Sequence, residues 1–239
     1  MDTLFLPPVA PRGPEWIEER LVYAARAREK SKFNTVLDAK ALFGDGGART
    51  TVVTRVREGA PGEVVGDVDV VHDLPTLRLE ERLTLVRQGD GVRAGVLTRV
   101  VGEARQKTID FAQSPFDLPA TSYPEVLLPF LMRRQPFGGD KLACYAWTSD
   151  RMVARVYYEG RKRTTLEVPA GRFGAREVWM YPDLNDWVAL GSVLTKLAKP
   201  LLPRYTMWFE EAAPHRCLRF EGPYGPPGAP EVVLELAES

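Results

Sequence analysis

The chain has few of the residues that most often carry chemistry. Its 239 residues include two cysteines and two histidines. Cys144 and Cys217 lie far apart, and neither has the Cys-x-x-Cys or Cys/His spacing of a zinc site. The two thiols could form one disulfide in an oxidising compartment or stay as small buried side chains in a reducing one. The sequence leaves both states open, and it predicts no metal and no cofactor.

Long apolar runs and net charge are also absent. No segment approaches the roughly 18–20 apolar residues of a transmembrane helix, and residues 1–13 lack the basic and apolar regions of a secretory signal. Lys plus Arg equals Asp plus Glu at 32 each, so no net field attracts nucleic acid. We expect no nucleic-acid partner and a cytoplasmic protein as the sequence stands. The alternative is the bacterial envelope, if a leader peptide is missing.

The dominant feature that is present is a period of two. Leucines at 77, 79, 83 and 85 alternate with charged residues, and segments 49–57 and 92–101 alternate in the same way. Glycine and proline turns at 44–47, 59–62 and 88–91 separate these segments and favour antiparallel pairing. Further strands are expected over residues 142–148, 151–159, 164–168, 173–181, 204–210, 216–221 and 231–236.

Two segments differ from this pattern. Residues 112–139 contain five prolines that interrupt sheet pairing, so we expect a crossover with a short helix at 125–134. Residues 183–199 place apolar side chains at spacings of three and four, with Asp183 as the N-cap and Pro200 after the last turn. This second segment is the best helix candidate in the chain.

These patterns together predict a mainly β fold. We expect a single strongly curved antiparallel sheet, or an incomplete β-barrel, with one or two short helices. Residues 1–15 form an extended N-terminal arm. Residues 16–239 form one β domain that includes the crossover at 112–139 and the inserted helix at 183–199.

One turn carries a family resemblance. The run Val168-Pro169-Ala170-Gly171-Arg172-Phe173 ends one strand and begins the next, and a Trp208-Phe209 strand and a last strand follow it. Over about residues 140–239 the chain resembles the bacterial family of unknown function catalogued as thirty-one-zero-eight. The resemblance implies an exported, curved antiparallel β protein and transfers no active site. The chain departs from that family in lacking a signal peptide and in inserting residues 183–199.

Four polar residues are candidates for a site. His72 lies between carboxylates in Asp69 to Asp73, so it could act as a base or bind a metal, or be a histidine in a loop after a strand. His215 lies two positions before Cys217, either as a partner of that thiol or as a structural residue of a hairpin. Glu81 and Glu177 fall on otherwise apolar strand faces, where burial would raise the pKa of a carboxyl group, or where the face reaches solvent.

No catalytic constellation accompanies these residues, so we expect a non-catalytic protein and leave an enzyme as the third hypothesis. The first hypothesis is a hydrophobic or lipid-like ligand in the concave face of the sheet. The alternative is a structural protein that docks on a partner or a membrane surface through residues 183–199. The expected ligand-lining residues are Trp179, Tyr181, Trp187, Met207 and Phe209.

Overall fold

All the secondary structure in the described part of the chain is β-strand. The computed structural model describes residues 13–28, 47–61, 63–73, 78–88, 91–101, 105–110, 122–124, 141–149, 152–183, 204–223 and 231–239. Thirteen strands form one sheet in the order β6-β5-β4-β3-β2-β1-β13-β12-β11-β10-β9-β8-β7. The predicted helices at 125–134 and 183–199 lie outside the described residues.

The strands lie in the sheet nearly in chain order. They are β1 (Ile17–Ala27), β2 (Ala48–Glu58), β3 (Glu63–Asp73), β4 (Arg78–Gln88), β5 (Gly91–Val101), β6 (Arg105–Asp110), β7 (Ser122–Pro124), β8 (Lys141–Ser149), β9 (Met152–Val168), β10 (Gly171–Pro182), β11 (Tyr205–Glu210), β12 (Cys217–Pro223) and β13 (Glu231–Glu238). Every pairing is antiparallel except that of β7 with β8. The predicted antiparallel sheet is confirmed, and β7 adds a parallel strand within the predicted crossover.

The β9–β10 hairpin contains the turn that the sequence singled out. β9 ends at Val168 and β10 begins at Gly171, whose φ of +135° is a conformation that suits glycine. Phe173 returns toward the core and packs against it. Where the sequence predicted two strands, 151–159 and 164–168, the structure has the single long strand β9. An irregularity in the pairing between Arg176 and Val178 bends this hairpin.

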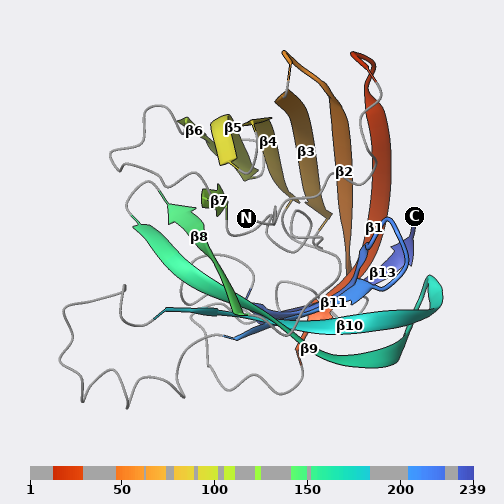
Figure 1. Cartoon of the computed structure of the whole chain (residues 1–239). Helices are drawn as coiled ribbons and strands as arrows, with labels where there is room; N and C mark the ends of the chain where they lie inside the picture. The colour runs from red at the N-terminus through yellow and green to blue at the C-terminus, as the bar shows by residue number, and fades with distance from the viewer. Residues whose placement is uncertain are drawn as a thin grey trace.

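The sheet curls strongly, so that β1–β6 form one wall and β8–β13 form the other (Figure 1). The tip of the β9–β10 hairpin reaches back to β13, where the Ala170 N–H donates to the Leu236 carbonyl at 2.9 Å. Val168 at this tip belongs to the hydrophobic core. Because the hairpin bends toward the face that carries the core, that face is the concave one. At the two ends of the sheet, β7 approaches β5.

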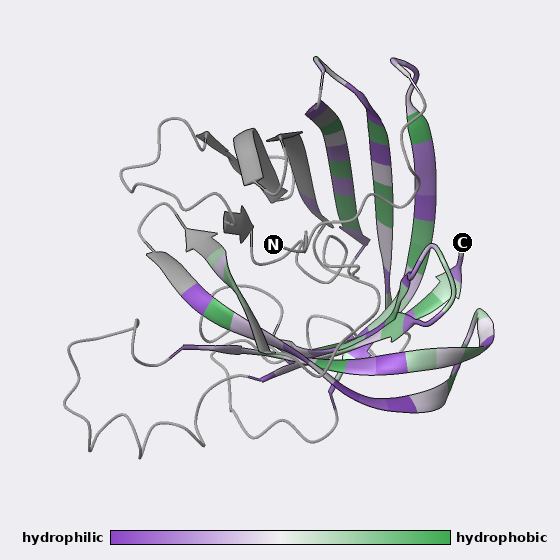
Figure 2. Ribbon diagram, viewed as in Figure 1, coloured by the Kyte–Doolittle hydropathy of each residue, from purple (hydrophilic) through white to green (hydrophobic). Residues whose placement is uncertain are grey.

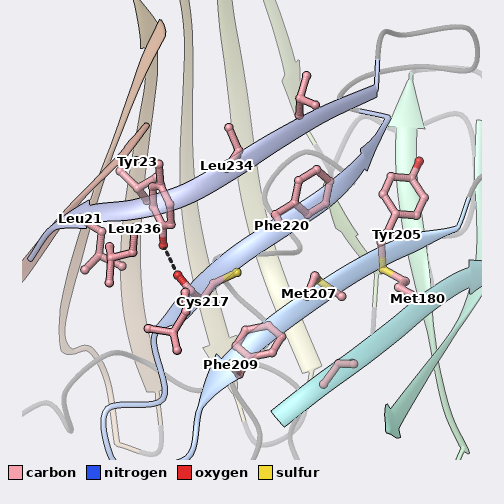
Figure 3. Packing of buried hydrophobic residues seen from close by; sticks show 14 of the residues in the cluster. Leu21, Tyr23, Met180, Tyr205, Met207, Phe209, Cys217, Phe220, Leu234 and Leu236 are labelled. Carbon is pink, nitrogen blue, oxygen red and sulfur yellow. Dashed lines mark hydrogen bonds between the residues drawn. The ribbon is translucent and has the colours of Figure 1, made fainter. Parts of the chain in front are cut away.

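Alternation along the strands gives the sheet two chemically different faces, visible as green and purple bands in Figure 2. We call them the apolar face and the polar face and define each by its residues in β10–β13. The apolar face carries Val178, Met180, Met207, Phe209, Phe220 and Leu234, all buried. The polar face carries Glu177, Trp179, Tyr181, Thr206, Trp208 and Arg219. Side chains of the apolar face pack together across β1, β13, β12, β11 and β10 (Figure 3).

The first and last described strands meet at a seam, where β1 pairs with β13. On the apolar face, the buried Tyr23 hydroxyl donates to the Cys217 carbonyl at 2.8 Å, which connects β1 to β12 (Figure 3). On the polar face, alternating charges connect the same three strands. This charge ladder consists of Arg26, Glu235, Arg219, Glu221, Arg28 and Glu231.

Candidate functional site

The predicted ligand-lining residues lie on both faces of the sheet. Met207 pairs with Val178 on the apolar face, whereas Trp179 pairs with Thr206 on the polar face. Tyr181 is on the polar face with Trp179, and Phe209 is on the apolar face with Met207. Trp187 lies outside the described residues. The structure therefore brings Met207 and Phe209 together and places Trp179 and Tyr181 behind them, because alternate residues of a strand point to opposite sides.

On the apolar face, Met207 and Phe209 have no exposed surface. The Phe209 ring lies 6.4 Å from the ring of Tyr158 on β9, centre to centre, in a tilted arrangement. Tyr205 and Phe220 form a second tilted pair at 6.0 Å. Aromatic and sulfur-containing side chains thus dominate this part of the face; the rings provide large apolar surfaces, and methionine adapts to an apolar neighbour of varied shape.

On the polar face, Trp179 lies between two guanidinium groups. The Cζ atom of Arg161 on β9 is 4.1 Å from the centre of the Trp179 ring, and that of Arg204, just before β11, is 4.2 Å from it. The indole N–H donates to Glu177 Oε1 at 2.7 Å. The Trp179 indole is therefore surrounded by charged groups, two cations and a carboxylate, and does not line an apolar ligand site.

Glu177 was predicted on an otherwise apolar strand face, but the strand register places it on the polar face, where it is buried with 8% of its surface exposed. Besides the indole of Trp179, it faces Lys162, whose Nζ lies 3.6 Å from Glu177 Oε2. Both carboxylate oxygens of this buried side chain therefore have a partner, one an N–H group and the other a cation. Glu177 therefore anchors Trp179.

Tyrosines extend the polar face beyond Trp179. Tyr181 donates to Glu159 Oε2 at 3.2 Å, and its ring lies 5.8 Å from that of Tyr157, centre to centre. Burial, with the nearby Glu159 as a further cause, raises the pKa of the Tyr181 hydroxyl. The Tyr157 hydroxyl donates to the buried Asp183. Aromatic rings and charged groups therefore alternate along β9 and β10 on this face.

His72 is not in a loop after a strand, because it lies within β3 and is 4% exposed. Its Nδ1 is 2.9 Å from the Thr50 hydroxyl on β2. Burial lowers the pKa of His72 to about 4, so the ring is neutral near pH 7. The sequence placed this histidine among carboxylates, but strand alternation points it to the apolar side, away from Asp69 and Asp73.

The remaining candidates have separate places in the sheet. His215 lies in the β11–β12 connection with a φ of +59°, and its Nδ1 is 3.2 Å from the Glu210 carbonyl oxygen. Cys144 and Cys217 are free and buried, and burial raises the pKa of the Cys144 thiol to about 12. Glu81 pairs through its backbone with Val70 in β4 and β3, and its side chain lies outside what the structure describes.

Across the described residues, no group of three or more histidine, cysteine, aspartate or glutamate side chains could hold a metal ion. The same residues contain no helix with the length and apolar character to cross a bilayer.

The sequence did not predict the contacts around Trp179. Arg161 belongs to a run of basic residues that alternation alone assigns to a solvated strand face, and its aromatic partner is on another strand. The available signal was the phase of Trp179, which alternates with the apolar Val178 and Met180 and so points with Glu177 to the polar side. A tryptophan on the polar side of a strand indicates a specific partner there.

No protein-family model matches the chain, and no curated protein matches it. Three solved bacterial structures are similar to it. One is a putative lipoprotein from Parabacteroides distasonis, 11% identical, with a TM-score of 0.40 over 100% of this chain and 99% of that chain. Another is a putative exported protein with a YmcC-like fold from Bacteroides fragilis, 13% identical, with a TM-score of 0.35 over 99% of each chain.

The third is a β-barrel-like protein of a domain of unknown function from Brucella abortus. It is 11% identical, with a TM-score of 0.37 over 91% of this chain and 94% of that chain. At these identities and TM-scores the likeness brings no site to this chain. Membership of the family that the Val168 to Phe173 turn resembles remains a prediction.

Proposed function

We propose that this protein binds a hydrophobic or lipid-like ligand on the apolar face, inside the curl of the sheet, without catalysing a reaction. One observation carries the proposal. The buried apolar side chains form one continuous cluster that runs from β3 through β1 and β13 to β8, across both walls of the curl. The cluster therefore follows the concave face rather than filling a gap between two layers.

The size of the sheet supports this proposal. Side chains fill the interior of a closed barrel of about eight strands, and barrels with more strands enclose additional space. This sheet has thirteen strands, and its ends approach each other where β7 lies near β5. We infer from this strand number that the curl encloses space beyond its own inward side chains. An apolar molecule would complete the packing.

The chemistry of the concave face supports a molecule that is apolar over most of its length. The buried polar side chains described on this face of β2 and β3 are Thr50, Thr54 and His72. His72 is neutral near pH 7 and bonded to Thr50, which suits orientation of a polar end rather than proton transfer. The predicted lining is revised accordingly to Met207 and Phe209, with Met180 and Phe220 beside them.

Extraction and probe binding test this proposal together. The purified full chain is extracted with chloroform and methanol, and the extract is analysed for lipid by mass spectrometry. The extracted protein is then titrated with a fluorescent fatty acid. We expect a stoichiometric lipid in the extract and saturable binding of the probe. An extract without lipid, together with no probe binding, would show that the chain fills its own concave face.

Variants on the two faces provide the control. Met207→Trp enlarges a fully buried side chain of the apolar face and should weaken probe binding by competing for space. Trp208→Phe changes the adjacent residue on the polar face and should leave binding unchanged. If Met207→Trp does not fold, Ala146→Leu on β8 makes a smaller enlargement on the same face. Equal binding by all folded variants would contradict the proposed location.

A further inference from the structure

We propose that Arg161 and Arg204, the two guanidinium groups stacked on Trp179, form a binding site for a phosphate or similar oxyanion group. The site lies on the polar face, so it is separate from the apolar ligand proposed above and does not depend on it.

The strand register fixes the arrangement of the three side chains. Trp179 pairs with Glu159 on β9 and with Thr206 on β11. Arg161 lies two residues after Glu159, and Arg204 lies two residues before Thr206, so both arginines share the face of Trp179. They approach the indole from opposite neighbouring strands, at 4.1 and 4.2 Å from the ring centre. The ring therefore holds two guanidinium groups in defined positions.

The Trp179 indole is itself held in place by a hydrogen bond at its N–H group. Its N–H is bonded to Glu177 Oε1 at 2.7 Å, and Glu177 is 8% exposed. A guanidinium stacked on an aromatic ring keeps its N–H groups at its edge, where they remain able to donate. Preorganised guanidinium groups lose little side-chain freedom when they bind an oxyanion, and this favours binding.

Among the described residues, carboxylates neutralise the cations around the Trp179 ring only in part. Within the described part of the chain, Arg204 has no carboxylate within ion-pair distance, whereas Arg155 and Arg163 on the same hairpin each have one. Arg204 is also exposed. Arg161 uses Nη1 for Glu159 Oε1 at 2.6 Å and makes no other described hydrogen bond. Lys162 adds a third positive charge on the neighbouring position.

Two carboxylates oppose an anion here, and both are already engaged. Glu159 accepts from Arg161 and from the Tyr181 hydroxyl at 3.2 Å. Glu177 accepts from Trp179 and faces Lys162. The three cations Arg161, Lys162 and Arg204 outnumber these two carboxylates by one, which leaves one positive charge. Phosphate matches the planar donor edge of a guanidinium and forms charge-assisted hydrogen bonds with it.

The test follows the indole N–H resonance of Trp179 in the full chain, identified by its absence in Trp179→Phe. Sodium phosphate is titrated against sodium chloride of equal ionic strength. We expect a saturable shift with phosphate that chloride does not reproduce. Arg204→Gln should weaken phosphate binding about tenfold or more, because a charge-assisted donor is lost. Arg172→Gln, at an exposed arginine of the β9–β10 turn, should bind as the unaltered chain does.

Vesicles distinguish the sources of the oxyanion. Phosphatidylglycerol vesicles that sediment with the unaltered chain, but not with Arg204→Gln, would assign the site to a lipid head group. Phosphate binding without vesicle binding would assign it to a soluble phosphorylated molecule. Arg204→Lys keeps the charge without the planar donor edge and should bind at an intermediate level. The proposal is overturned if phosphate causes no shift, or if Arg204→Gln responds as the unaltered chain does.

Discussion

The two faces of β10–β13 share one backbone, but different interactions stabilise their side chains. On the apolar face, Met207, Phe209 and Phe220 are stabilised by exclusion from water and by close packing. On the polar face, the charge ladder and the Trp179 cluster keep partly exposed ions beside aromatic rings. The stabilisation gained by burying apolar side chains is large and grows with the buried area, whereas each exposed ion pair contributes little to the free energy of unfolding. The comparison suggests that the apolar face carries most of the stability and that the polar face is available for recognition.

The largest test of this difference compares adjacent residues of β11. Phe209→Ala should lower the free energy of unfolding by about 3–5 kcal/mol, since it leaves a cavity in a fully buried cluster. Trp208→Ala, on the polar face, should cost clearly less because that side chain is only partly buried. Urea denaturation of both variants measures the two losses. Equal losses would show that the faces do not differ in this way.

A second test uses the buried histidine of the apolar face. The pKa of His72 is lowered to about 4 in the folded state from an ordinary 6.5, so the unfolded chain binds its proton first. The stability contributed by neutral His72 is therefore complete above pH 6.5 and is lost as the pH falls toward 4. The loss is about 3 kcal/mol, from about 1.4 kcal/mol for each pKa unit.

The measurement is the free energy of unfolding between pH 8 and pH 4 for the unaltered chain and for His72→Gln. Carboxylates lose stability with acid in both proteins, so the difference between the two curves isolates the histidine. Parallel curves would mean that His72 keeps an ordinary pKa in the folded protein.

A third test removes a polar bond from within the apolar face. Tyr23→Phe deletes the hydroxyl that donates to the Cys217 carbonyl at 2.8 Å and leaves the ring in place. We expect a loss of about 1–2 kcal/mol, because the buried carbonyl loses a hydrogen-bond partner. Chemical denaturation measures the loss. No loss in Tyr23→Phe would place the stability of the seam elsewhere.

The smallest expected effect concerns the charge ladder of the polar face. Arg219 Nη1 lies 3.0 Å from Glu235 Oε1, and the two side chains are 24% and 19% exposed. A double-mutant cycle with Arg219→Gln and Glu235→Gln should give a coupling of about 1 kcal/mol or less. The coupling should decrease further in 1 M sodium chloride, since salt screens partly exposed charges. A larger coupling energy that salt does not change would show that the charge ladder behaves as a buried ion-pair network.

Local patterns in the sequence were enough to predict most strands of the C-terminal half. A period of two with glycine turns located β8 and β10–β13 to within a few residues, because alternation and turn chemistry are properties of neighbouring residues. The pattern divided β9 at residues 160–163, where Gly160 and three exposed basic residues hide the alternation. The structure continues the strand there because β10 pairs with it on both sides of an irregularity.

The candidate site was less predictable. Trp179, Tyr181, Met207 and Phe209 were grouped by residue type, but the phase of each strand divides them between two faces. The contact of Arg161 and Arg204 with one indole depends on the register of three strands, and a single segment does not contain that information. The carboxylates around His72 in sequence suggested a base or a metal ligand, with a loop histidine as the alternative, although its alternation with Val68 and Val70 was a usable signal for burial in a strand.

The seam between β1 and β13 has a consequence for the order in which the molecule can form. Tyr23 and its acceptor Cys217 are 194 positions apart in the chain, and β1 gains its second neighbour only from the last strand. During synthesis, one edge of β1 stays unpaired until β13 has been made, after the other strands of the sheet. Closing such distant contacts is slow, and an unpaired edge is open to wrong partners meanwhile. Completion of the sheet at β1 therefore depends on β13, and a chain without β13 would expose the edge of β1 to aggregation.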